Sequence, residues 1–199
     1  MERVTNFLKY IPSIKLVGVS GALAVANAKK DDDIDLFIVS RSKLVWTTRF
    51  FATLMVELIG VRRHPNEKEI SDKICLNMFV DEDHLQIAKD ERDLFSAHEV
   101  VQLKPLYDRD GTYSKFLKAN NWVKEYLPNA ITKDIRIRRC NGNKKRNLRL
   151  LNILEKLLCV IQLWYMRRHR TKEVIKDGII RFHPKDARER ILRKFKLAS

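Results

Sequence analysis

Cysteine, glycine and proline are all scarce in this 199-residue chain, which holds three cysteines, six glycines and five prolines. Cys75, Cys140 and Cys159 have no metal-binding spacing, and an odd number cannot all pair. A disulfide-stabilised secreted fold is therefore disfavoured, and we expect reduced structural thiols in a cytoplasmic protein. The chain also has no internal repeat and no low-complexity tract.

Long uncharged hydrophobic runs are missing as well. The first fifteen residues, MERVTNFLKYIPSIK, contain no apolar stretch of signal-peptide length. The most apolar segment, residues 148–166, is interrupted by polar and charged side chains, namely Arg149, Asn152, Glu155, Lys156 and Gln162. Because a membrane span would not carry those charges, the sequence predicts a buried helix here and no membrane partner.

Basic residues are unevenly distributed along the chain. Residues 1–110 hold 16 Lys and Arg against 18 Asp and Glu, whereas residues 111–199 hold 24 against 7. The net charge of +15 therefore belongs to the C-terminal part. Such asymmetry favours an anionic partner for that part, most simply RNA or DNA.

Apolar residues make up 45% of the chain, enough for a folded domain with a hydrophobic core. The apolar periodicity predicts an α/β core and then a basic helical region, with residues 131–145 as the linker. We accordingly expect one unit over residues 1–130 and another over 131–199. The predicted strands are 14–19, 34–39 and 74–80, and the predicted helices are 4–10, 21–28, 42–58, 96–106, 112–118, 121–126, 147–170 and 185–196.

Asp33-Ile34-Asp35 is the most informative motif. It begins the apolar run IDLFIV, where an aspartate has no structural reason to lie. In a strand, alternate side chains share a face, so both carboxylates would point the same way from Cα atoms about 6–7 Å apart. Two such carboxylates can share Mg²⁺ or a pair of metal ions. A solvated turn before an ordinary strand is the structural alternative.

A glycine turn precedes this motif. The segment from Leu16 to Ala22 is a short apolar stretch that runs into Ser20-Gly21. Glycine at such a turn lets backbone N–H groups approach a phosphate closely. A strand, a glycine turn and then paired aspartates together indicate metal-dependent phosphoryl or nucleotidyl transfer.

This combination resembles the DNA polymerase β nucleotidyltransferase superfamily, most closely its small bacterial and archaeal members. The resemblance covers about Lys15 to Pro128 and includes the segment FSAHEVVQLKPLY. It implies a small mixed sheet flanked by helices, with Asp33 and Asp35 as catalytic ligands of Mg²⁺ or Mn²⁺. It also implies that Ser20, Gly21 and Ala22 contact the phosphates of an NTP.

Two positions depart from the family pattern. Ala22 stands where the family has serine, so a hydroxyl contact to phosphate is lost there. The third carboxylate of the family lies in a later strand, but the polar position of the strand 74–80 is Asn77. Asn77, through its carbonyl oxygen, and Asp81, at the strand end, are the two candidates for a third metal ligand.

Further candidates surround this core. Glu99, beside His98 on the helix predicted at 96–106, is either a base near the active site or part of a solvated helix face. Arg62-Arg63-His64 is either a triphosphate contact or a surface turn. The basic residues predicted to contact nucleic acid are Arg136, Arg138, Arg139, Lys144, Lys145, Arg167, Arg168 and Arg170.

The sequence therefore supports a metal-dependent nucleotidyltransferase that moves NMP from an NTP to an acceptor hydroxyl, with RNA as the expected acceptor. A protein acceptor is the first alternative, because some small relatives resemble antitoxins that nucleotidylate a partner toxin. The second alternative is a non-catalytic nucleic-acid-binding protein on a decayed transferase core. Ala22 and Asn77 support this alternative, because both depart from the family pattern.

Overall fold

The structure is a computed structural model of the whole chain and describes residues 2–27, 32–64, 67, 70–130, 148–167 and 173–182. Its helices are α1 (Glu2–Leu8), α2 (Gly21–Ala24), α3 (Val45–Leu58), α4 (Leu94–Gln102), α5 (Thr112–Ala119) and α6 (Leu148–Arg167), with 3-10 turns η1 (Lys89–Glu91) and η2 (Asn121–Glu125). Its strands are β1 (Ile14–Val19), β2 (Ile34–Ser40), β3 (Ile74–Asp81), β4 (Lys104–Asp108), β5 (Val174–Lys176) and β6 (Ile179–Arg181).

The strands form one mixed sheet in the order β4-β1-β2-β3-β6-β5. Only β2 and β3 run parallel, and every other neighbouring pair is antiparallel. β1 and β2 are the most apolar strands, and almost all of their side chains are buried, as expected for central strands covered on both faces. The small mixed sheet flanked by helices that the sequence predicts is confirmed.

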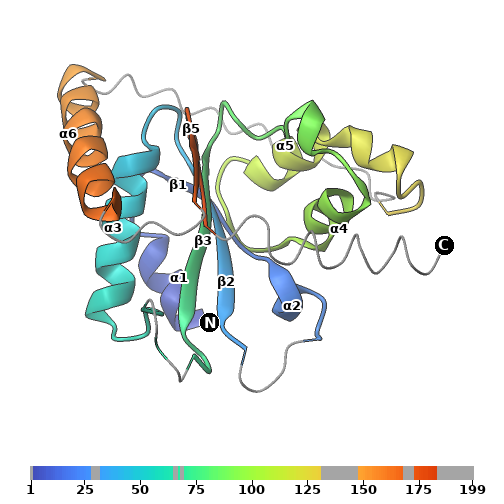
Figure 1. Ribbon diagram of the computed structural model, residues 1–199, viewed down its shortest axis with the longest axis horizontal. Coiled ribbons are helices and arrows are strands. Elements are labelled where there is room, and N and C mark those ends of the chain that lie inside the picture. Colours follow the sequence, from blue (N-terminus) through green and yellow to red (C-terminus); the bar gives the residue numbers. More distant parts are fainter. Residues whose placement is uncertain are drawn as a thin grey trace.

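Helices cover both faces of the sheet (Figure 1). One face packs against α1, α3 and α6, and its core includes Leu8, Val56 and Leu158. The other face packs against α4, α5 and η2, with Phe116 and Trp122 in its core. The sheet is thus the middle layer of three, and each face buries a separate apolar cluster.

The C-terminal residues return to the same sheet. β6 pairs with β3 through Phe79 and Ile180, both of which are fully buried. α6 packs along α3, and the Glu155 carboxylate accepts hydrogen bonds from the backbone N–H groups of Trp46 (2.7 Å) and Thr47 (2.8 Å). Because those N–H groups lie in the first turn of α3, Glu155 satisfies donors that a helix leaves unpaired.

The segment after α4 differs from the expectation. The prediction of a helix over residues 96–106 was wrong at its C-terminal end, because α4 stops at Gln102 and β4 begins at Lys104. Pro105 has no N–H to donate and disfavours a helical conformation in the residue before it. Proline is tolerated in an edge strand, and β4 lies at the edge of the sheet.

The hairpin β5–β6 was also missed. Its two strands are three residues each and are joined by Asp177-Gly178, with Gly178 at φ +65°. An Asp-Gly pair between short apolar stretches is a hairpin signal that the sequence did contain. The predicted strands and the other predicted helices within the described ranges are present with shifted ends, whereas the helix predicted over 185–196 lies outside the described residues.

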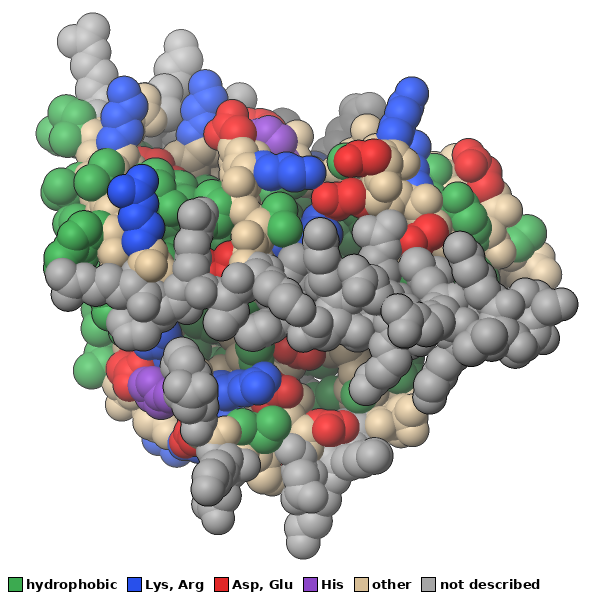
Figure 2. All heavy atoms as spheres, viewed as in Figure 1, with side chains coloured by type: hydrophobic (Ala, Val, Ile, Leu, Met, Phe, Trp, Pro, Cys, Tyr) green, Lys and Arg blue, Asp and Glu red, His purple; other side chains and the backbone are tan. Residues whose placement is uncertain are grey.

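The prediction of a buried helix over residues 148–166 is wrong for one face of α6, which is apolar and exposed. Hydrophobic side chains gather on the left of the molecule over this helix (Figure 2), and Leu150, Ile153, Val160 and Trp164 are each more than half exposed. None of the helices in the described part of the chain has the length and apolarity needed to cross a membrane.

Candidate active site

Asp33 and Asp35 lie at the start of β2, in the middle of the sheet. Asp35 is the second residue of the strand, and Asp33 comes directly before it. The backbone carbonyl of Asp35 accepts a hydrogen bond from the Ser20 N–H at 3.0 Å, which ties β2 to the glycine turn after β1. The glycine turn and the two aspartates therefore lie next to one another.

Gly21 touches the carboxylate of Asp35 directly. Its φ is +68°, and a Cβ atom built on it would lie 2.8 Å from Oδ2 of Asp35. Any other residue would have a strained backbone, and the Asp35 side chain would have to shift to make room for a Cβ atom. The positive φ and this close approach both favour glycine here.

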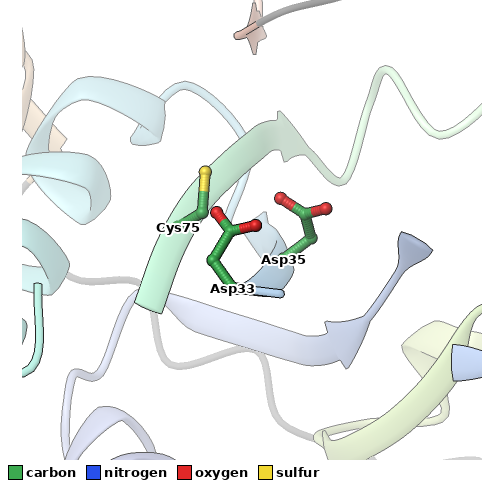
Figure 3. A group of neighbouring side chains, drawn as sticks. All are labelled: Asp33, Asp35 and Cys75. Carbon is green, nitrogen blue, oxygen red and sulfur yellow. The ribbon is translucent and has the colours of Figure 1, made fainter. Parts of the chain in front are cut away.

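Cys75 completes the cluster, and the sequence analysis missed it. In the parallel pairing of β2 and β3, Cys75 is the Cα partner of Asp35. The ligand atoms of Asp33, Asp35 and Cys75 all lie within 4.8 Å of one another. Figure 3 shows the three side chains gathered on one side of the sheet. The signal that could have found Cys75 is its place in the strand next to the aspartate strand.

The electrostatics of this cluster suit a divalent cation. Burial, and next the nearby charge of Asp33, raise the pKa of Asp35 to about 6. Two carboxylates at this separation repel each other, and a cation between them would remove that cost. Asp33, Asp35 and Cys75 therefore form a donor set that fits a divalent metal ion.

Arg63 supplies positive charge at the same place. Its Nη1 lies 2.5 Å from Oδ2 of Asp33, and the Asp33 side chain is only 14% exposed. Burial works against the charge of Arg63, but the Asp33 carboxylate outweighs it and the pKa of Arg63 is raised. Arg62-Arg63-His64 was predicted to be either a triphosphate contact or a surface turn. Arg63 lies at the aspartate cluster, whereas Arg62 and His64 both pair with Glu57.

A cavity of about 420 Å³ opens beside the cluster. Its wall includes Ser20, Gly21, Arg63 and Cys75 together with the two aspartates. Glu99 from α4 also lines it, and burial raises the pKa of that carboxyl group. Glu99 thus lies at the cavity, whereas the preceding residue, His98, does not line it.

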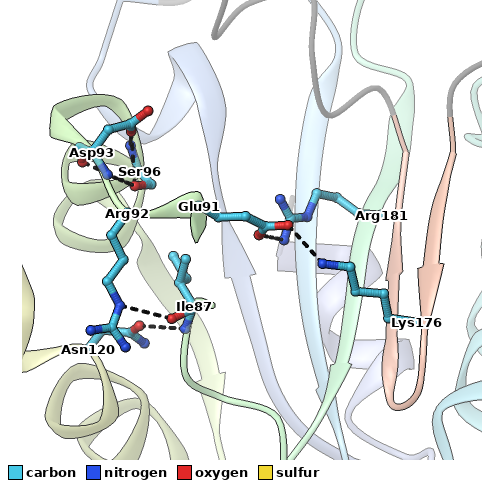
Figure 4. A network of polar contacts seen from close by, with 8 residues as sticks. All are labelled: Ile87, Glu91, Arg92, Asp93, Ser96, Asn120, Lys176 and Arg181. Atoms are coloured by element: carbon cyan, nitrogen blue, oxygen red, sulfur yellow. Dashed lines mark hydrogen bonds and ion pairs between the residues drawn. The ribbon is translucent and has the colours of Figure 1, made fainter. Parts of the chain in front are cut away.

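The C-terminal hairpin closes one side of this cavity. Glu91 in η1 accepts hydrogen bonds from Lys176 (3.2 Å) and Arg181 (2.8 Å), so the hairpin is joined to the segment before α4 (Figure 4). All three side chains line the cavity. In the same view Asp93 and Ser96 form a reciprocal cap at the start of α4, which fixes the helix that carries Glu99.

Asn77 and Asp81, the two candidates for a third metal ligand, lie in different surroundings. Asn77 lines the cavity, in a stretch where β3 bulges relative to β2. Asp81 lies six residues beyond Cys75 on β3, about 20 Å along the strand. The Asp81 carboxylate is buried and accepts hydrogen bonds from the backbone N–H groups of Lys43 (3.2 Å) and Asp83 (3.0 Å), and it pairs with His84 at 2.6 Å. Asp81 therefore stabilises a turn, away from the aspartate pair.

The remaining predicted residues are divided between the site and regions away from it. Ser20 and Gly21 line the cavity, whereas Ala22 is exposed on α2 and is not part of the cavity wall. Arg167 is exposed at the last position of α6. The other predicted nucleic-acid contacts lie outside the described residues, namely Arg136, Arg138, Arg139, Lys144, Lys145, Arg168 and Arg170.

Comparisons with known proteins return solved structures alone. No family model and no curated protein matches the chain. One similar structure is a toxin–antitoxin with AMP-PNP, at 15% identity and a TM-score of 0.38, covering 63% of this chain and 88% of the other. Another is a mutant of the toxin–antitoxin MntA-HpeT, at 14% identity and a TM-score of 0.37, covering 64% and 88%.

A third similar structure is the tri-AMPylated Shewanella oneidensis HEPN toxin in complex with MNT antitoxin. It is 13% identical, with a TM-score of 0.32, and covers 64% of this chain and 93% of the other. At this level of similarity, the chemistry of the site has to be derived from the side chains of this chain.

Proposed function

We propose that this protein is a metal-dependent nucleotidyltransferase that moves NMP from an NTP to an acceptor hydroxyl. The observation that carries the proposal is the contact between Gly21 and Asp35 beside Asp33. A turn able to bind phosphate and a pair of metal-binding carboxylates meet at one cavity. Nucleotidyl transfer needs these two elements together, because the phosphates must lie against the metal ligands.

Asp33 and Asp35 would hold the metal. A divalent ion, Mg²⁺ or Mn²⁺, would supply charge neutralisation at the α-phosphate and activation of the acceptor hydroxyl. Asp35 lies within β2 and Asp33 directly precedes that strand, so the sheet holds the backbone of both residues in place. Fixed ligands of this kind favour transition-state stabilisation over reorganisation.

The phosphates would lie between the glycine turn and the basic side chains of the cavity. Ser20 and Gly21 form one wall, and Arg63, Lys176 and Arg181 contribute positive charge. Arg63 is held by Asp33 in the structure. The Arg63 guanidinium lies at the cavity wall and is suited to bind phosphate oxygens bidentately.

Glu99 is our candidate for the group that receives the acceptor proton. It lines the cavity, and desolvation by the surrounding protein raises the pKa of its carboxyl group, although the residue keeps access to solvent. A carboxylate tuned upward in this way is suited to general-base catalysis near neutral pH. Asn77, in the same wall, cannot take this role because an amide does not accept a proton.

We favour a protein acceptor over RNA. The described cavity wall carries four carboxylates, Asp33, Asp35, Glu91 and Glu99, against the three cations Arg63, Lys176 and Arg181. Arg63, Lys176 and Arg181 each pair with one of those carboxylates. A charge-balanced wall does not form the positive groove that draws a polynucleotide to an active site. RNA remains the alternative for the basic residues after 130.

The experiment compares ATP labelled at the α-phosphate with ATP labelled at the γ-phosphate, incubated with the protein, Mg²⁺ or Mn²⁺ and an extract of cells. We expect label in an acceptor from α-labelled ATP only, with the γ-label released in pyrophosphate. Protease should remove the labelled acceptor and ribonuclease should not. No transfer with any of the four NTPs would leave a non-catalytic binding protein, and an acceptor labelled from the γ-position would mean phosphoryl transfer.

A further inference from the structure

We infer that Cys75 is the third ligand of the metal site and gives it a preference for thiophilic divalent ions such as Zn²⁺ or Cd²⁺ over Mg²⁺. This inference rests on the proposed metal site, but it concerns the identity of the bound ion. It is independent of which acceptor is modified.

The position of Cys75 is set by the sheet. β2 and β3 are parallel neighbours, and in this register Cys75 lies beside Asp35, so that both side chains leave the same face. Sγ lies within 4.8 Å of a carboxylate oxygen of each aspartate. Bond lengths of about 2.0–2.3 Å require ligand atoms about 3.3–4.0 Å apart, so small side-chain rotations that draw the three atoms together would let one ion reach all of them.

No other described side chain offers a better third donor. Asn77 follows two residues later, at the bulge of β3, and offers only a neutral amide oxygen, a weaker ligand than a thiolate. Asp81 is at the far end of the strand, where backbone N–H groups and His84 occupy its oxygens. Arg63 is a cation and competes for Asp33 instead of binding metal. The third position therefore falls to sulfur.

Sulfur changes which ion the site prefers. Mg²⁺ is bound by oxygen ligands and dehydrates reluctantly, whereas thiolates favour softer ions. A site of two carboxylates and one thiolate should thus bind Zn²⁺ or Cd²⁺ most tightly, Mn²⁺ less tightly and Mg²⁺ least. Mg²⁺ would be held by the two aspartates alone.

The metal-free state is consistent with this role. The Cys75 thiol hydrogen-bonds to Asp35, and burial together with the charges of Asp35 and Asp33 raises its pKa well above the usual range. Because cysteine binds metal as the thiolate, binding through Cys75 would release its proton.

The test is the ultraviolet charge-transfer absorption of a cadmium–thiolate bond in the full-length protein. We expect this band on titration with Cd²⁺, no band in Cys75→Ser, and an unchanged band in the matched control Cys159→Ser. Cys159 lies on α6 and is not part of the aspartate cluster. Affinity for Cd²⁺ should fall at least about tenfold in Cys75→Ser.

A second measurement covers the case in which Cys75→Ser does not fold. Wild-type protein is alkylated with and without Cd²⁺, and the modified cysteines are located by mass spectrometry. Protection of Cys75 by the ion is expected. A band that persists in Cys75→Ser, Cd²⁺ binding with neither band nor protection, or no Cd²⁺ binding at all would each overturn the inference. None of these outcomes decides whether Mg²⁺ supports nucleotidyl transfer.

Discussion

Gly21 and Asp35 are in contact: a Cβ atom on Gly21 would lie 2.8 Å from the Asp35 carboxylate. One residue belongs to the turn after β1 and the other to β2, so the contact joins the proposed phosphate-binding turn to the proposed metal-binding strand. A side chain at position 21 would push against the Asp35 carboxylate.

Replacement of Gly21 by alanine tests this contact. Gly21→Ala should cost about 1–2 kcal/mol of unfolding free energy from its positive φ, and it should also displace Asp35. We expect Mn²⁺ affinity to fall at least about tenfold, measured by isothermal titration calorimetry. Gly60→Ala is the matched control, because Gly60 has φ +75° and no atom within 4 Å of its would-be Cβ.

The control should lose similar stability and no metal affinity. If Gly60→Ala and Gly21→Ala bind Mn²⁺ alike, the contact has no role in placing Asp35. If Gly21→Ala also retains the full stability of wild type, position 21 does not require a positive φ.

Glu91 links the C-terminal hairpin to the cavity wall. Burial opposes its charge, but hydrogen bonds and charge from Arg181 and Lys176 outweigh burial and lower the pKa of Glu91. Glu91→Gln should cost about 1–2 kcal/mol of unfolding free energy at pH 7. Glu57→Gln, which alters a surface pair with Arg62, should change stability by less than about 0.5 kcal/mol.

The pH dependence of the Glu91→Gln effect has a definite sign. Because the folded pKa of Glu91 is below its unfolded value of about 4.3, its contribution is complete above that value. It is lost as the pH falls through the lower folded pKa. The stability difference between wild type and Glu91→Gln, from urea denaturation, should therefore shrink below about pH 4. A difference that grows on acidification would contradict the assignment.

Glu155 ties α6 to the first turn of α3. Glu155→Ala removes the acceptor for the N–H groups of Trp46 and Thr47 and should cost about 2 kcal/mol of unfolding free energy. Lys156→Ala, at the next position of α6 and exposed, is the control and should have little effect. Thermal denaturation of both variants measures the difference, and equal melting temperatures would mean that α6 does not dock through Glu155.

Asp81 and Asn77 should respond oppositely to substitution. Asp81→Asn weakens the buried contacts to Lys43, Asp83 and His84, so stability should drop by about 1–3 kcal/mol with Mn²⁺ affinity unchanged. Asn77→Asp adds a carboxylate to the cavity wall, so Mn²⁺ binding should be at least as tight as in wild type. If Asp81→Asn lost metal affinity but kept full stability, Asp81 would be a metal ligand after all.

The sequence predicts the centre of this fold well, because local patterns determine it. The apolar strands over 14–19, 34–39 and 74–80 and the glycine turn are short-range signals, and they place Gly21 near Asp35. Cys75 could not be assigned in the same way, because its proximity to Asp35 depends on the register between β2 and β3. Strand pairing is a long-range property that spacing along the chain does not encode.

The edges of the sheet were harder to predict. β4 begins at Lys104, near the end of an apolar run that Pro105 interrupts. Its pairing with β1, almost 90 residues earlier in the chain, decides its conformation. The three-residue strands β5 and β6 carry too short a pattern for periodicity, and only Asp177-Gly178 marks them. In β4, pairing with β1 therefore overrode the local helical pattern. In β5 and β6, strand pairing determines a conformation that the short local pattern does not.

The most direct test of the account is pyrophosphate release from NTP by the wild-type protein, Asp33→Asn and Asp35→Asn in the presence of Mg²⁺ or Mn²⁺ and the labelled acceptor. Each variant should lose at least about 100-fold in rate, equivalent to about 2.7 kcal/mol of transition-state stabilisation. Asp35→Asn should also unfold no more easily than wild type without metal, since it removes a buried charge that faces Asp33. Asp72→Asn, at an exposed position, is the control and should keep full activity. Rates that are equal in all four proteins would contradict the assignment of Asp33 and Asp35 as the metal-binding pair.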